Sequence, residues 1–207
     1  MTRATIGVRV KSGWATVVLI AGAARAPCAA DRRVIELSDP AVPSSRQPYH
    51  AVMAALRADG KKLERYLRKV IERVSRGSVR ALLKEYRTRG HDVRGVGLVV
   101  GSDIDPGRIA NDHIRAHALE GRLFRTVLEA VVNSFGLPCG VVVEREAYAV
   151  AARVLKRSEG ELRSVVGQFG RSLDGPWRAD EKTASLAGWI MLRRRLPSVA
   201  GRRSTRP

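Results

Sequence analysis

The sequence predicts an α/β protein in which helices flank a five-stranded mixed sheet. Two apolar segments joined by a tight turn begin the chain at residues 6–20, in "IGVRVKSGWATVVLI". A helical period follows over residues 49–89, and two continuous apolar segments come later, each followed by helical segments. Antiparallel strands that are consecutive in sequence, followed by strand–helix crossovers, give a mixed sheet with helices on both faces.

The first half of the chain predicts three strands and a long helix. Ser12-Gly13 makes the turn between the first two strands, and residues 34–37 form a third, short strand. Over residues 49–89 apolar positions recur with helical spacing, and Gly77-Ser78 is expected to interrupt this helix or to separate it from a second. The apolar face consists of Leu63, Leu67, Val70, Ile71 and Val74.

The second half predicts two buried strands, each followed by helices. The apolar run at residues 93–102 suits a central strand that is covered on both faces. Asp105 or Asn111 could cap the next helix, which ends near residue 135 because Gly136 and Pro138 follow. The remaining predicted elements are a strand at 139–144 and helices at 145–155, 158–169 and 179–195.

One domain accounts for most of the chain, because 207 residues are enough to bury a sizeable single core. We expect this domain to span residues 1–192. The remaining residues, 193–207, read "RRRLPSVAGRRSTRP" and hold six arginines and no acidic residue. Such a composition predicts a disordered basic arm.

The charge of the chain favours a polyanionic partner. Lysine and arginine total 38 against 20 acidic residues, a formal charge of +18. Nucleic acid is the first partner to consider, although a GC-rich genome would also raise the arginine content. Aromatic residues make up only 5% of the chain, so contact with the backbone of duplex or branched DNA, or of structured RNA, is favoured over base stacking. The candidate contacts are Lys61, Lys62, Arg65, Arg68, Lys69, Arg73, Arg193, Arg194, Arg195, Arg202 and Arg203.

The cysteines and the apolar runs favour a cytoplasmic protein without a membrane span. Cys28 and Cys139 form no C-x-x-C pair, which favours reduced thiols, and no apolar run reaches the roughly 18 residues that a bilayer requires. Basic residues before "WATVVLIAGAA" and small residues after it also resemble a secretory signal. The strand alternation and the Ser-Gly turn favour the hairpin over this alternative.

The second half also resembles a known family. The segments "ALEGRLFRTVLEAVVNSFGLPCGVVVEREAYAVAARVLKRSEGELRSVVGQF" and "PWRADEKTASLAGWIML" are similar in order and character to RuvC-type Holliday-junction resolvases, over roughly residues 95–192. The resemblance implies the RNase H-like fold, a nucleic-acid substrate and a carboxylate cluster that holds two divalent ions such as Mg²⁺. The resemblance leaves open whether the protein forms a homodimer.

The resemblance also implies where the metal ligands would lie. The family places one acid on the first strand, where this chain has Arg9, and one near the end of the fourth, where it has Asp103. Of two acids a turn apart on the last helix, Asp180 matches the first and Thr183 replaces the second. Glu181 is the alternative to the second acid, although it lies about 100° around the helix from Asp180. At most two of four ligands remain, and Arg9 could pair with Asp103 or Asp180 in place of a metal.

Each candidate also has a structural interpretation. Asp180 and Glu181 begin a helix, where acids are favoured by capping alone. Glu144 follows a strand, at the edge where α/β sites form, but it could equally start the next helix. His113 and His117, with Glu120 three residues further on, could place three metal ligands on one helix face, but no second ligand segment is evident.

Three functions are compatible with these features. The favoured hypothesis is a nucleic-acid-binding module with a degenerate metal site, no required cofactor and weak or no nuclease activity. The second is a divergent Mg²⁺-dependent endonuclease that uses Asp103 and Asp180, with Glu181 or Glu144. The third is a protein-interaction scaffold whose basic charge is compositional.

Overall fold

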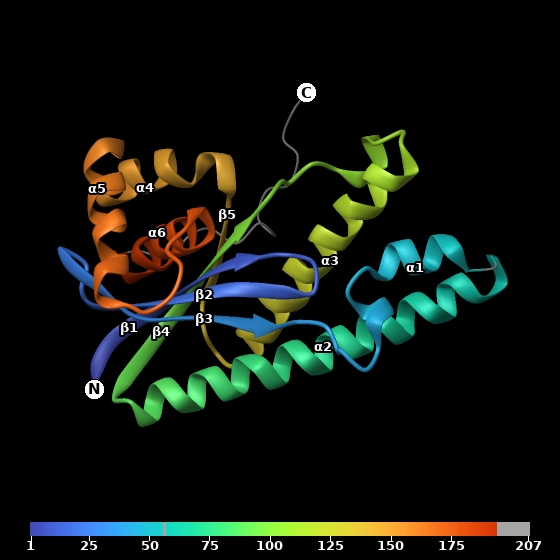
Figure 1. The fold of residues 1–207 in the computed structure, drawn as a ribbon, viewed down its shortest axis with the longest axis horizontal. Helices are drawn as coiled ribbons and strands as arrows, with labels where there is room; N and C mark the ends of the chain where they lie inside the picture. Colours follow the sequence, from blue (N-terminus) through green and yellow to red (C-terminus); the bar gives the residue numbers. More distant parts are fainter. Residues whose placement is uncertain (56, 194–207) are drawn as a thin grey trace.

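A central five-stranded sheet with helices on both faces forms the body of the computed structural model, which describes residues 1–55 and 57–193 (Figure 1). The strands are β1 (Thr2–Val10), β2 (Trp14–Ala23), β3 (Ala26–Glu36), β4 (His91–Val100) and β5 (Cys139–Val143). The helices are α1 (Pro48–Ala54), α2 (Arg57–Thr88), α3 (Asp112–Ser134), α4 (Ala147–Leu155), α5 (Glu159–Phe169) and α6 (Ala179–Arg193). Short 3-10 turns lie at Pro43–Ser45, Pro106–Arg108, Glu144–Glu146 and Gly170–Ser172.

The strand order β3-β2-β1-β4-β5 confirms the predicted mixed sheet. β1, β2 and β3 are antiparallel neighbours, whereas β4 is parallel to β1 and β5 is parallel to β4. The carboxyl ends of β1, β4 and β5 therefore meet at one edge of the sheet, which is where α/β proteins form their sites.

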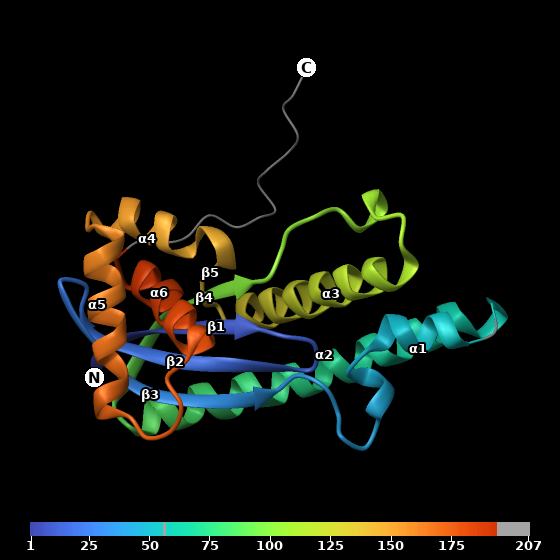
Figure 2. The ribbon, with the colours of Figure 1, turned by 45° about the horizontal axis from the view of Figure 1, so that its top comes forward.

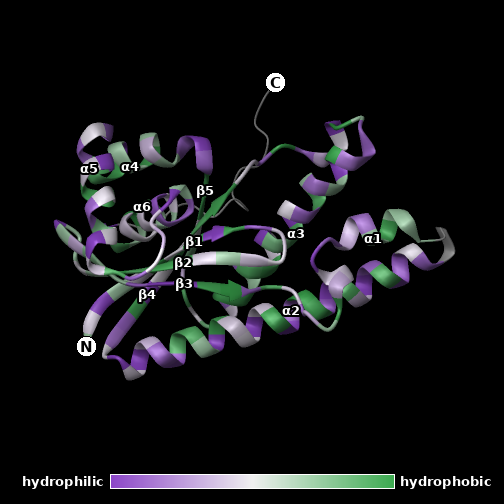
Figure 3. Cartoon of the chain, viewed as in Figure 1, coloured by the Kyte–Doolittle hydropathy of each residue, from purple (hydrophilic) through white to green (hydrophobic). Residues whose placement is uncertain are grey.

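Two separate cores cover the two faces of the sheet. On one face α2 and α3 bury residues such as Ile71 and Phe124 against Ile6 and Leu98. On the other face, α4 and α5 pack with α6 in a second core that contains Trp189 of α6. Figure 2 shows the sheet between these two layers. Hydrophobic and hydrophilic residues alternate along α2, as expected for a helix with one buried side (Figure 3).

Helix α6 lies unusually close to the sheet because glycines line the contact. A Cβ atom on Gly7 would lie 1.7 Å from the carbonyl oxygen of Ala184, and one on Gly97 would lie 2.5 Å from that of Ala187. The hydroxyl of Thr5 donates to the carbonyl oxygen of Gly188 at 2.7 Å. These contacts fix the position of α6 along β1.

Several predicted boundaries are wrong. The third strand begins at Ala26, because its polar residues pair with β2 along its whole length. The segment at 49–89 divides near Ala55, which has an extended backbone, rather than at Gly77-Ser78. Helix α2 continues past Gly77 because buried Val79 and later residues extend its apolar face.

The apolar run of the secretory alternative forms β2, between β1 and β3. Within the described residues, no helix combines the length and the apolar character that crossing a membrane requires. Cys28 and Cys139 are free thiols, and burial raises the pKa of Cys139 to about 12.

Arg193, predicted to begin the basic arm, instead ends α6 and donates to the carbonyl oxygen of Leu155 at 2.9 Å. The rest of the predicted arm lies outside the described residues.

Candidate functional site

Arg9 ends up at the carboxyl edge of the sheet because β1 and α6 share a register. Alternate residues of β1 face α6, where Thr5 contacts Gly188, Gly7 lies against Ala184, and Arg9 lies opposite Asp180. Two residues of strand span about 6.7 Å and four residues of helix about 6 Å, so the two elements stay in step. The buried contacts of the glycines thus place the side chain of Arg9 beside the first turn of α6.

The guanidinium group of Arg9 is buried and contacts two carboxylates. Its Nη2 lies 2.5 Å from Oε2 of Glu144, which directly follows β5, and its Nε lies 3.7 Å from Oδ1 of Asp180. Its Nη1 donates to the carbonyl oxygen of Val10 at 2.9 Å. Lys11 adds a second cation, with Nζ 3.0 Å from the same oxygen of Asp180. Two carboxylates therefore face two cations.

Asp103 lies at the same edge but has a different partner. It follows β4 and pairs with the guanidinium group of Arg125, which α3 contributes. Arg9 therefore pairs with Asp180 and not with Asp103, the other partner that the sequence left open. Its contact with Glu144 was not anticipated.

Glu181 and Thr183 have structural partners outside this group. Glu181 is buried, its Oε1 lies 2.9 Å from Nη2 of Arg32 on β3, and its Oε2 accepts from the backbone N–H of Arg178 at 2.9 Å. The hydroxyl of Thr183 donates to the carbonyl oxygen of Ala179 at 3.0 Å. Glu181 is thus a helix cap and an ion-pair partner, and the structure does not bring it to Arg9.

A cleft of about 700 Å³ opens between the carboxyl edge of the sheet and α3. Its cationic residues outnumber its acidic ones. Arg122 is exposed and has no carboxylate partner within the described part of the chain. The charged residues that line the cleft are Arg9, Lys11, Arg122 and Arg125, with Asp103 and Asp105.

These residues do not fit a pair of magnesium ions. Mg²⁺ requires near-octahedral oxygen ligands. Here one oxygen of Glu144 lies 2.5 Å from Nη2 of Arg9, and one oxygen of Asp180 lies 3.0 Å from Nζ of Lys11 and 3.7 Å from Nε of Arg9. The carboxylate of Asp103 is directed to Arg125. A cation that cannot lose its proton lies where the resemblance places a metal ligand.

The basic residues predicted on the long helix are exposed along α2. Lys61, Lys62 and Arg65 have no carboxylate partner among the residues described. Arg68 pairs with Glu72 at 3.0 Å, and Arg73 pairs with Asp39 at 2.5 Å. Lys69 lines a shallow groove of about 290 Å³ between α2 and α3. Of the arginines predicted near the C-terminus, Arg194, Arg195, Arg202 and Arg203 lie outside the described residues.

Sequence reasoning missed three cations of the cleft: Lys11, Arg122 and Arg125. Arg125 carried a usable signal, because it falls beside Phe124 and three residues before Leu128 on the apolar side of its helix. A buried arginine at such a position needs an acidic partner, and Asp103 is that partner. Lys11 and Arg122 carried no signal of this kind.

Comparison with known proteins supports the fold. No protein-family model and no curated protein sequence matches this chain. The structure of T. thermophilus RuvC in complex with Holliday junction substrate is similar, with a TM-score of 0.51, 11% sequence identity and 92% of each chain covered. Another Thermus thermophilus RuvC structure has a TM-score of 0.48 and 12% identity, also with 92% of each chain covered. The mixed sheet and its flanking helices are thus those of the RuvC, RNase H-like fold.

Proposed function

We propose that this protein binds duplex or branched DNA through phosphate contacts at its cleft and that it lacks two-metal nuclease activity. The observation that carries the proposal is the pairing of Arg9 with Glu144 and Asp180 at the carboxyl edge of the sheet. Arg9 neutralises carboxylates that would otherwise repel a phosphate or recruit a metal ion.

The charge of the cleft supports the binding half of the proposal. Arg122 offers an unpaired guanidinium group among the described residues, and Arg9, Lys11 and Arg125 lie around it. Phosphate contacts by such groups release condensed counterions and need no sequence-specific readout. The similar RuvC structure holds a Holliday junction, which makes branched DNA the first substrate to test.

The binding test measures the affinity of the full chain for a four-way junction, and for a duplex of the same sequence, over a series of salt concentrations. We expect the logarithm of the binding constant to fall linearly with the logarithm of salt, with a slope of about −0.9 for each phosphate neutralised. Replacing Arg122→Ala should weaken binding to both DNAs and make the slope shallower by about one.

A matched control is Arg153→Ala, because Arg153 is exposed and unpaired in the described structure but lies on α4, on the opposite face of the sheet. Lys69→Ala tests the groove between α2 and α3 separately, and deletion of residues 194–207 tests the predicted arm. If neither DNA nor structured RNA binds at low salt, the scaffold hypothesis replaces this one.

The divergent endonuclease is the second candidate. Glu144, Asp180 and Asp103 do lie at the same edge of the sheet, within reach of the cleft or of Arg9. Displacement of Arg9 by a metal ion would free two of these carboxylates. A cleavage assay distinguishes this candidate from the binding module.

A further inference from the structure

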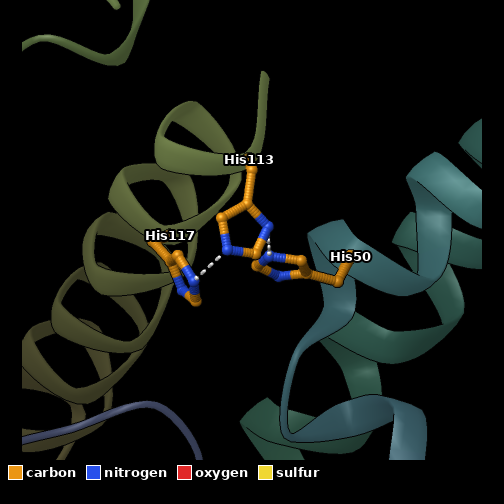
Figure 4. A group of neighbouring side chains, drawn as sticks. All are labelled: His50, His113 and His117. Carbon is orange, nitrogen blue, oxygen red and sulfur yellow. Dashed lines mark hydrogen bonds between the residues drawn. The ribbon is translucent and has the colours of Figure 1, made fainter. Parts of the chain in front are cut away.

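Three of the four histidines of the chain converge between α1 and α3 (Figure 4). His50 comes from α1, whereas His113 and His117 occupy successive turns of α3. Nε2 of His50 lies 3.1 Å from Nδ1 of His113, and the Nε2 atoms of His113 and His117 are 3.2 Å apart. One nitrogen from each ring can be chosen so that all three lie within 4.8 Å of one another.

A fully buried carboxylate supports two of these rings from behind. Oε1 of Glu120 lies 2.8 Å from Nδ1 of His50. Its other oxygen, Oε2, lies 3.5 Å from Nδ1 of His117 and has no hydrogen-bond partner within the described residues. A carboxylate can only accept, so the hydrogen bond to Glu120 places the proton of His50 on Nδ1. The longer contact favours the same tautomer of His117 through charge alone. The Nε2 lone pairs of His50 and His117 are then directed away from Glu120 and toward His113.

We propose that His50, His113 and His117 bind a divalent transition-metal ion, zinc in the first place, with Glu120 as a positioning residue. Nε2 of His50 and Nε2 of His117 approach different nitrogens of His113, and these lone pairs can be satisfied by an N–H of His113 or by a cation bound among the three rings. At a Zn–N distance of about 2.0–2.1 Å, the nitrogens of a tetrahedral site lie about 3.3 Å apart. One nitrogen from each ring lies within 4.8 Å of the other two, so small side-chain rotations would close the site around an ion. Imidazoles held by a carboxylate on the far nitrogen are the usual arrangement around protein-bound zinc.

The chemistry of this site differs from that of the carboxylate edge. Three imidazole nitrogens favour zinc and its neighbours in the transition series, whereas magnesium prefers oxygen ligands. His117 also lines the cleft, so the ion would lie beside the proposed DNA surface without depending on Arg9 or Asp180. The site can therefore exist whether or not the protein binds DNA.

A metal at this position would also attach α1 to the rest of the fold. Helix α1 has only seven residues, and its polar contacts to other helices include those of His50 and a hydrogen bond from Tyr49 to Glu64 at 3.0 Å. An ion shared with His113 and His117 would cross-link segments about 63 residues apart. Metal binding is therefore expected to increase the thermal stability of the chain.

The test uses the untagged full chain after removal of metal by a chelator. Titration calorimetry with Zn²⁺ alone should give one ion per chain, and Co²⁺ should give the visible absorption of a tetrahedral site. At a free Zn²⁺ concentration one hundred times the dissociation constant, the unfolding midpoint should rise by about 5–10 °C. Single replacements His50→Ala and His117→Ala should abolish binding, and Glu120→Gln should weaken it about 10- to 100-fold.

His91→Gln is the matched control, because His91 is the one remaining histidine and lies on β4 away from the cluster. Circular dichroism of each metal-free variant establishes that it folds before the titration is interpreted. Absence of stoichiometric Zn²⁺ binding by the wild-type chain would overturn the proposal. Binding that survives both His50→Ala and His117→Ala, or that His91→Gln removes equally, would also overturn it.

Discussion

Arg9 and Glu144 are 135 residues apart in the sequence, yet Nη2 of Arg9 lies 2.5 Å from the carboxylate of Glu144. The contact joins the end of β1 to the turn that follows β5, across the intervening strand β4. It places a permanent positive charge at the edge of the sheet where three parallel strands end.

A double-mutant cycle measures the strength of this pair. We expect Arg9→Met and Glu144→Gln to show a coupling of about 1–2 kcal/mol in urea denaturation, because the Arg9 side chain is only 6% exposed while that of Glu144 is 36% exposed. The pair Arg68 and Glu72 on α2, with side chains 51% and 47% exposed, serves as the control. Its coupling should not exceed about 0.5 kcal/mol. Equal couplings for the two pairs would show that the Arg9 pair has no special role.

Because α6 lies so close to β1, we expect the replacement Gly7→Ala to lower the free energy of unfolding strongly. The added methyl group would collide with the backbone of Ala184, which cannot rotate away, so α6 must move off the sheet. A loss of at least about 3 kcal/mol in the free energy of unfolding is expected. Gly77→Ala is the matched control, since a Cβ atom there meets nothing within 4 Å, and it should stabilise α2 by about 0.5–1 kcal/mol. Similar effects at both glycines would contradict the proposed register of β1 and α6.

The carboxylate of Asp31 is expected to make an acid-sensitive contribution to the free energy of unfolding. Burial alone would raise its pKa, but hydrogen bonds from Arg33, Tyr86 and Arg89 lower it to about 2. Since the folded pKa is below the unfolded value, the stabilisation is complete above about pH 4–5 and is lost as the pH falls toward 2. The replacement Asp31→Asn should therefore cost about 1–3 kcal/mol near neutral pH and progressively less in acid.

Chemical denaturation of the wild type and of Asp31→Asn at several pH values measures this difference. The control is Asp174→Asn, because Asp174 is exposed and has no ion-pair partner in the described structure. A difference between wild type and Asp31→Asn that stays constant from pH 7 to pH 2 would contradict the assignment of the stabilising hydrogen bonds to the ionised carboxylate.

The fold could be predicted from local patterns, but much of the site could not. The strands β1 and β2 and the helix α2 follow from patterns of neighbouring residues, and the structure confirms these elements. The first part of β3 was missed because Asp31 and its basic neighbours hide the strand alternation. Their partners are distant in sequence: Glu85 and Tyr86 on α2 contact Arg33 and Asp31, and Glu181 on α6 contacts Arg32. Nothing near His50 in the sequence indicates that α1 folds back against α3, so the second segment of the histidine cluster was also missed.

Catalysis separates the two leading functions. We expect no Mg²⁺- or Mn²⁺-dependent cleavage of a labelled four-way junction, duplex or RNA–DNA hybrid by the wild-type chain, because the charge of Arg9 opposes a metal ion at the same point. Replacing Arg9→Asp together with Thr183→Asp should restore weak Mn²⁺-dependent cleavage. Thr183 lies one turn after Asp180 on α6, so the variant supplies carboxylates at the two positions where the resemblance implies acids and this chain has none.

The control for this variant is Arg9→Asn with Thr183→Asn, which removes the positive charge without adding carboxylates. If the control cleaves as well as the acidic variant, the carboxylates are not acting as metal ligands. Calorimetric titration with Mn²⁺ gives an independent measurement, since the acidic variant should bind the ion more tightly than the wild type even where cleavage is slow. Robust cleavage by the wild-type chain that disappears in Asp180→Asn would overturn the proposed loss of activity, because it would mean that a metal ion displaces Arg9 from its carboxylates when substrate binds.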